Sequence, residues 1–180
     1  FLFTADGHRE GNFKTWDSWT GEKLQNSIRH SGWILDIAVS SDGKRIATGS
    51  WDDTIMLSSD DKEEDVRLTG HIEGVVGLAF TTDGRRLASI SNDKTCRLWD
   101  AVSGREILKL TGRNEDLQNV AFWKEDHKLI VSDGTRELIV FDGSPLIEEE
   151  TVKSVILRGH KDRVVDVAYS ASGDRLLSAS

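Results

Sequence analysis

The chain has few of the residues and segments that would place it in a membrane or in an oxidising compartment. Its 180 residues include one cysteine, Cys96, so no disulfide can form within the chain. A single thiol is typical of proteins from a reducing compartment, and we therefore expect an intracellular, cytoplasmic protein. No apolar run approaches the ~18 residues of a membrane span, and no signal peptide is visible. We expect no contact with a membrane.

Positive charge is also scarce, and so are the residue patterns that hold metals or phosphates. Lysine and arginine number 23 against 31 acidic residues, which gives a net charge of −8. A negative chain is poorly attracted to phosphate backbones, so nucleic acid is not expected as a partner. The histidines are dispersed, the cysteine has no second ligand at metal spacing, and no glycine-rich phosphate loop occurs. We predict no metal site and no cofactor.

What the chain does contain is one unit written several times. His30, His71 and His160 stand at the head of similar segments, and the period between the first two is about forty residues. A further copy, headed by Arg113, lies between those at His71 and His160. The spacing that separates His71 from Trp99 recurs from head to matching position in the copies headed by His30 and Arg113. Constant cores with joints of varying length indicate a repeated supersecondary unit.

Within a copy, the apolar positions and turn residues predict four short antiparallel strands. After His30, the first strand has apolar residues at Ile34, Ile37 and Val39, a step of three followed by a step of two. Because a regular strand alternates with period two, the extra residue predicts a β-bulge. A glycine-containing turn, SSDGK (40–44), leads to the second strand. A third strand and an outer strand complete the unit.

The copy from Gly70 to Asp100 has Gly-His near its start, an aspartate in a tight turn and Trp-Asp at its end, and in this it resembles the WD40-repeat family of β-propellers. The resemblance implies an all-β fold, a WD40-type propeller fragment of about four four-stranded antiparallel blades that starts and ends mid-repeat. The implied units are a partial blade (strands b, c and d), two regular repeats, a degenerate repeat with a long loop at 142–153, and a truncated repeat; they occupy residues 1–29, 30–70, 71–112, 113–159 and 160–180.

The number of predicted strands leaves the ring open. We expect three strands in the first unit, four in each of the next three and two in the last. A WD40 ring of seven or eight blades needs about 300 residues, so we expect missing blades or a second chain to close it. A four-blade ring is the alternative, with VVDVAYS (164–170) as the innermost strand of the first unit.

The resemblance also implies a buried, hydrogen-bonded tetrad with a structural role. Its residues are His71, Ser89, Asp93 and Trp99, and a partial set consists of His30, Thr48 and Asp52, with Ser58 in place of tryptophan. The third copy has Arg113, Val131, Thr135 and Phe141 at these positions and cannot form the tetrad. Serine, histidine and aspartate also build hydrolase triads, but a catalytic triad is not repeated along a chain. We predict no catalytic residue.

In WD40 propellers, the positions three and five after the head and the residue before the turn aspartate point from the top face and contact partners. The predicted bulge gives this mapping a physical basis. Two tryptophans and a leucine on one blade top form a candidate hot spot; the alternative is that they pack against neighbouring blades or a missing one. The predicted partner-binding residues are Trp33, Leu35, Trp51, Val76, Asn92, Asp116, Gln118 and Arg163.

Three functions remain open at this stage. The first is a non-catalytic protein–protein interaction scaffold that binds a protein or peptide on the top face. The second is a purely structural part, or a sensor or regulatory module, of a larger multidomain protein. The third, a propeller enzyme, would need a convergent acid, base or metal cluster, which the top-face residues lack. We expect the scaffold.

Overall fold

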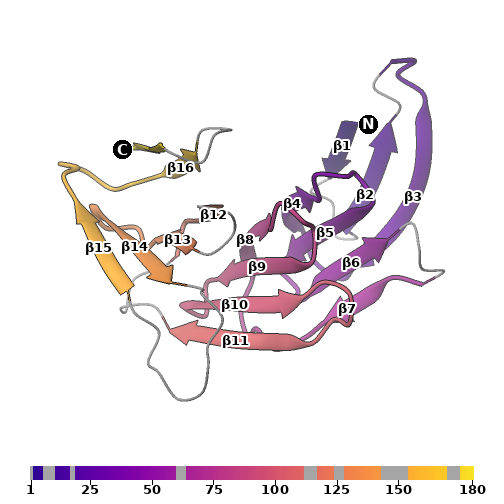
Figure 1. Cartoon of the computed structure of the whole chain (residues 1–180). Helices are drawn as coiled ribbons and strands as arrows, with labels where there is room; N and C mark the ends of the chain where they lie inside the picture. The colour runs from indigo at the N-terminus through magenta and orange to yellow at the C-terminus, as the bar shows by residue number, and fades with distance from the viewer. Residues whose placement is uncertain are drawn as a thin grey trace.

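The strands of the chain form five separate antiparallel sheets (Figure 1). The computed structural model describes residues 2–5, 11–16, 19–59, 64–111, 117–123, 128–142, 154–169 and 175–180. Within these ranges the regular structure is β-strand, and no helix there could cross a membrane. Each strand pairs with its neighbours in sequence, so every sheet is a meander.

We number the sheets in chain order. The first contains β1 (Leu2–Ala5), β2 (Gly11–Trp16) and β3 (Lys23–His30). The second contains β4 (Ile34–Val39), β5 (Arg45–Ser50), β6 (Ile55–Ser59) and β7 (Val66–Leu68). The third contains β8 (Val75–Phe80), β9 (Arg86–Ser91), β10 (Thr95–Asp100) and β11 (Glu106–Thr111). The fourth contains β12 (Asn119–Trp123), β13 (Lys128–Ser132), β14 (Glu137–Asp142) and β15 (Ser154–Arg158). The fifth contains β16 (Asp166–Tyr169) and β17 (Leu176–Ala179). These strand counts are those predicted from the sequence.

The predicted bulge is present in the first strands of the second and third sheets. In β4 the pairing with β5 skips Leu35, and in β8 the pairing with β9 skips Val76. The inserted residue turns the side chains around it out of the alternating register. The inserted residue of β4, Leu35, is exposed, and that of β8, Val76, is half-buried.

Each sheet has two ends, and the described residues that were predicted to bind a partner lie in or beside the loops at one of them. We call this end the upper face; it comprises the loops before the first strands and the turns between second and third strands, at residues 31–33, 51–54, 69–74, 92–94, 133–136 and 159–165. The Trp51 N–H donates to the Trp33 carbonyl over 2.8 Å, and the Asn92 N–H donates to the Gly74 carbonyl over 3.0 Å. The two loops at each sheet end are therefore joined through their backbones.

The sheets follow one another along an arc, with the N- and C-termini at its opposite ends (Figure 1). The inner strands β4, β8, β12 and β16 contact one another in that order. Apolar clusters fill the space between the second and third, third and fourth, and fourth and fifth sheets. β16 pairs with β17, and β1 pairs with β2, so the described residues do not form the four-blade ring that the sequence left open.

A buried thiol and a half-buried carboxyl group lie at the junctions between sheets. Cys96, in β10, belongs to the cluster between the third and fourth sheets, and burial raises the pKa of its thiol to about 12. Asp36, in β4, accepts a hydrogen bond from the Leu78 N–H of β8 over 2.7 Å and another from its neighbour Ile37 over 2.8 Å. Burial raises the pKa of Asp36 in spite of these two bonds. A carboxylate thus joins the inner strands of adjacent sheets.

Candidate functional site

The third sheet contains an unbroken chain of hydrogen bonds through four side chains. The Trp99 indole N–H donates to Ser89 Oγ over 2.8 Å, and Ser89 Oγ lies 2.8 Å from His71 Nε2. His71 Nδ1 lies 3.0 Å from Asp93 Oδ2. The loop before β8, the second strand, the following turn and the third strand each supply one residue. The set therefore ties all of these segments at the upper face to one another.

Every donor in this chain is satisfied when His71 is neutral. With its proton on Nδ1, His71 donates to Asp93 and accepts from the Ser89 hydroxyl, which in turn accepts from Trp99. Burial lowers the pKa of His71, although Asp93 opposes this. Burial would raise the pKa of Asp93, but hydrogen bonds from Thr95 and His71 outweigh it and bring the pKa to about 2. The pair is a neutral imidazole beside a carboxylate.

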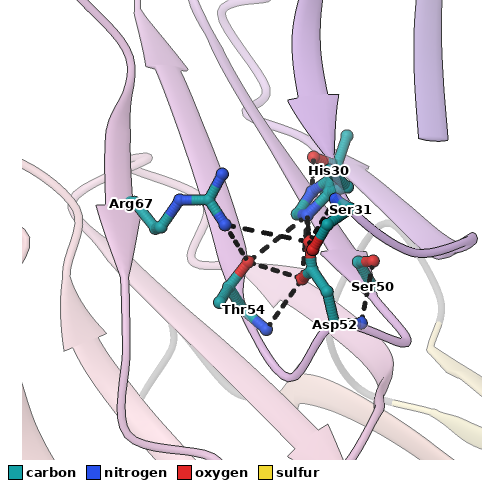
Figure 2. Close-up of polar contacts among 7 residues, drawn as sticks. His30, Ser31, Ser50, Asp52, Thr54 and Arg67 are labelled. Atoms are coloured by element: carbon teal, nitrogen blue, oxygen red, sulfur yellow. Dashed lines mark hydrogen bonds and ion pairs between the residues drawn. The ribbon is translucent and has the colours of Figure 1, made fainter. Parts of the chain in front are cut away.

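Most of this arrangement is repeated around Asp52 of the second sheet, with the histidine, His30, supplied by the end of β3 (Figure 2). His30 Nδ1 lies 3.1 Å from Asp52, and His30 Nε2 lies 2.9 Å from Thr48 Oγ1. Arg67, which reaches in from β7, lies 3.7 Å from the Asp52 carboxylate and donates to Thr54 Oγ1 over 3.1 Å. Burial would raise the pKa of Asp52, but its hydrogen bonds, the one from Thr54 foremost, lower it to about 2.

In the second sheet, Ser58 stands at the position that Trp99 has in the third, and its hydroxyl donates a hydrogen bond to the Asp65 carboxylate. In the fourth sheet, Val131 is buried and Phe141 packs on the apolar cluster beside it. Thr135 keeps one function of the turn aspartate, because its hydroxyl accepts from the Glu137 N–H over 3.1 Å. Arg113 lies outside the described residues. The fourth sheet thus replaces a polar chain with apolar packing.

Sequence reasoning missed several partners of the histidines and aspartates. Thr54 and Thr95 each donate to the Oδ1 atom of the aspartate two residues earlier, over 2.6 Å. The repeated Asp-x-Thr spacing, 52–54 and 93–95, is a sequence signal for this pair. His160 Nε2 lies 2.6 Å from Ser178 Oγ. The sequence signal for this contact is the spacing from His160 to Ser178, which equals the spacing from His71 to Ser89.

The side chains of the hydrogen-bonded chain in the third sheet are buried. Ser89 is fully buried, so its hydroxyl is shielded from any substrate. The described residues contain no group of three or more histidines, cysteines, aspartates or glutamates that could hold a metal ion. The chemistry that these side chains support is satisfaction of buried polar groups.

Trp33, Leu35 and Trp51 lie together at the upper end of the second sheet, with 54%, 37% and 59% of their surface exposed. We call them the aromatic cluster. A Cβ added to Gly74 of the third sheet would stand 3.1 Å from the Trp51 ring and 3.5 Å from Leu35. Trp51 and Leu35 therefore lie over the backbone of the adjacent sheet, and the missing side chain of Gly74 leaves room for them. The cluster spans the junction of two sheets.

The other predicted binding residues fall into two groups. Val76 and Asn92 are half-buried at the upper end of the third sheet. Arg163 donates a hydrogen bond from Nη2 to Gln118 Oε1, which links the fourth and fifth sheets. Asp116 lies outside the described residues. A hollow of about 600 Å³ adjoins the polar pair; its lining is formed by Asp133, Gly134, Thr135, Arg136, Glu137, Asp162 and Arg163.

Comparison with known proteins also identifies WD40 repeats in the chain. The family model "WD domain, G-beta repeat" matches residues 21–57, 63–100 and 151–180. The chain is 26% identical over 117 residues to the guanine nucleotide-binding protein G(I)/G(S)/G(T) subunit beta-1 of Homarus americanus, covering 63% of this chain and 34% of that protein. It is 26% identical over 186 aligned positions to the guanine nucleotide-binding protein subunit beta of Zea mays, covering 96% of this chain and 48% of the relative.

Among solved structures, that of U3-55K matches with a TM-score of 0.73 and 22% sequence identity. The match covers 89% of this chain and 49% of the other. At this identity the likeness shows the fold alone, and it confirms the all-β propeller fragment expected from the sequence. The chain spans about half or less of the length of the proteins that it matches.

Proposed function

The chain belongs to the WD40-repeat family, and from this premise we propose that it is a non-catalytic scaffold that binds a protein or peptide on the upper face. The observation that carries the proposal is the aromatic cluster. Large apolar side chains that are exposed and grouped at the end of a rigid sheet are typical of interface anchors. The backbone hydrogen bond between Trp51 and Trp33 fixes these turns relative to each other.

The remaining parts of the proposal follow from the arrangement of the sheets. We assign the repeats to residues 30–70, 71–112 and 113–159, with partial units at 1–29 and 160–180, because the strands of one sheet lie inside each range apart from His30, the last residue of β3. Gln118 and Arg163, between the fourth and fifth sheets, supply polar contacts to the part of the partner that extends beyond the aromatic cluster. A second chain or further blades complete the ring. We place the protein in the cytoplasm on the strength of its single, buried thiol.

The test is a comparison of three forms of the protein in a quantitative pull-down. The double variant Trp33→Ala/Trp51→Ala should lose at least tenfold of the bound partner, because hot-spot aromatics typically contribute ~2 kcal/mol or more each. Trp19→Ala is the matched control, since Trp19 is 95% exposed in the turn at the opposite end of a sheet. It should retain full binding. Equal capture by wild type and the double variant would contradict the proposal.

Folding of the variants needs a separate measurement. Because the two indoles are largely exposed, each truncation should change the free energy of unfolding by no more than about 0.5 kcal/mol. Urea unfolding followed by far-ultraviolet circular dichroism provides this value. A large loss of stability would identify the two tryptophans as core residues, and their binding role would then be abandoned.

A further inference from the structure

We infer that the aromatic cluster recognises a positively charged segment of its partner, with an arginine side chain stacked on the exposed indoles. This inference rests on the proposed function, because it names the chemistry of the partner at the same surface. It comes from the charges around the cluster. An indole face attracts a cation electrostatically, and a guanidinium group can also stack flat on it.

Two carboxylates flank the cluster on either side of the sheet junction. Glu73 directly precedes Gly74, over which Trp51 lies, and its side chain is exposed. Asp53 follows Trp51 by two residues in a turn, where its φ is 67°. Among the described residues, neither Glu73 nor Asp53 takes part in an ion pair. Both negative charges are therefore available to an incoming cation.

The positive side chains nearby are already engaged. Arg67 donates to Thr54 and lies 3.7 Å from the Asp52 carboxylate, which partly offsets its charge. Lys94 also has an interaction of its own. The upper ends of the second and third sheets thus combine the apolar surface of the aromatic cluster with the negative charges of Glu73 and Asp53. An acidic peptide or an anionic lipid surface would be repelled here, whereas a basic segment is attracted.

Arginine fits this surface better than lysine does. Its guanidinium is planar, so one face can lie on an indole while its edge donates two parallel hydrogen bonds to a carboxylate such as Glu73. The lysine ammonium is a compact, strongly hydrated charge that offers neither a flat face nor a fork of donors. An apolar residue next to the arginine would contact Leu35, the third member of the cluster.

The experiment is a selection of displayed random twelve-residue peptides on the immobilised full chain, after removal of peptides that bind Trp33→Ala/Trp51→Ala. Enriched peptides are synthesised with a fluorescent label, and their dissociation constants are measured by anisotropy. We expect them to contain arginine, and we expect arginine-to-glutamine changes to weaken binding at least tenfold. On the protein side, Glu73→Gln and Asp53→Asn should each weaken binding about threefold.

Glu22→Gln is the matched control, since it removes one exposed negative charge at the opposite end of a sheet. It should change binding less than twofold, which separates local recognition from attraction to a chain of charge −8. Enriched peptides that lack cations, or that bind Glu73→Gln and Glu22→Gln equally, would overturn the arginine inference and leave an apolar docking site. If the selection enriches no peptides whose binding depends on Trp33 and Trp51, the proposed function is overturned as well.

Discussion

At the scale of single residues, the same hydrogen-bonded chain occurs in three stages of completeness. The third sheet has all four members, the second has a threonine in the serine position and lacks the tryptophan, and the fourth retains a single hydroxyl, that of Thr135. Where polar members are lost, apolar side chains such as Val131 fill the space. The energetic importance of the turn residue should therefore differ between sheets.

Asp93→Ala should lower the free energy of unfolding by about 1–3 kcal/mol, because it leaves His71 and Thr95 without their buried acceptor. Thr135→Ala, at the matching position of the fourth sheet, should lower it by less than Asp93→Ala does, since it removes two half-buried bonds, to Asp133 and from Glu137, and leaves no buried charged acceptor missing. Urea unfolding of the two variants at pH 7 gives both values. Equal losses would show that the hydrogen-bonded chain does not stabilise the third sheet.

The same groups predict how stability depends on pH. Burial lowers the folded-state pKa of His30 and His71, so the unfolded chain takes up protons first and stability falls as the pH drops below about 6.5. Asp52 and Asp93 have folded-state pKa values of about 2, so their stabilisation is present above about pH 4 and is lost between about pH 4 and 2. Asp36 acts in the opposite direction, because its pKa is raised.

Urea midpoints measured from pH 7 to pH 2.5 should therefore decline in two stages. Asp93→Asn, which has no titrating carboxyl at that position, should show a smaller decline in the acidic stage. A midpoint that stays constant between pH 7 and pH 5 would contradict the neutral, buried state of the two histidines.

At the scale of strands and sheets, local patterns were predictable from the sequence and contacts between units were not. The step of three followed by two among the apolar residues located the bulge in β4, because side chains in a regular strand alternate with period two and an inserted residue breaks this alternation. The bond from Leu78 to Asp36 left no such signal, since a backbone N–H is present at every residue but proline. The approach of Arg67 to Asp52 depends on the register between the third strand and the outer strand of the second sheet, which differs from that in the third sheet.

Asp36 provides a test of the junction between the second and third sheets. Asp36→Ala leaves the Leu78 N–H without its acceptor and should lower the free energy of unfolding by about 1–2 kcal/mol. Asp36→Asn keeps a carbonyl oxygen and removes a half-buried charge, so its loss should be smaller at pH 7. Glu22→Ala is the exposed control for urea unfolding. If Asp36→Ala matched that control, the bond across the junction would contribute no stability.

At the scale of the whole molecule, stability comes from sheets that contact their neighbours along the arc. Such an arrangement behaves as a row of units coupled at their junctions. In the fifth sheet, β17 pairs with β16 alone among the described strands, and Val165 and Leu177 are 53% and 63% exposed. An unpaired strand edge beside apolar surface is a site for association with another chain.

We therefore expect the chain to self-associate in a concentration-dependent manner. Light scattering should give a mass above that of the monomer at micromolar concentration. Leu177→Lys, which places a charge beside the free edge of β17, should shift the mass toward the monomer. The exposed Trp19→Ala variant serves as control and should behave as wild type. A monomeric wild type at all concentrations would contradict the role assigned to this edge.

The reactivity of Cys96 can be used to measure how often the third and fourth sheets separate. A thiol whose pKa is about 12 is almost entirely protonated at neutral pH, and it is sealed between the third and fourth sheets, so a disulfide reagent can modify it only during moments when that seam parts. Modification of Val131→Ala, which loosens the seam, should be faster than that of wild type. Asp52→Ala should leave the rate nearly unchanged if the seam opens locally, and should accelerate it if labelling requires the entire arc to unfold.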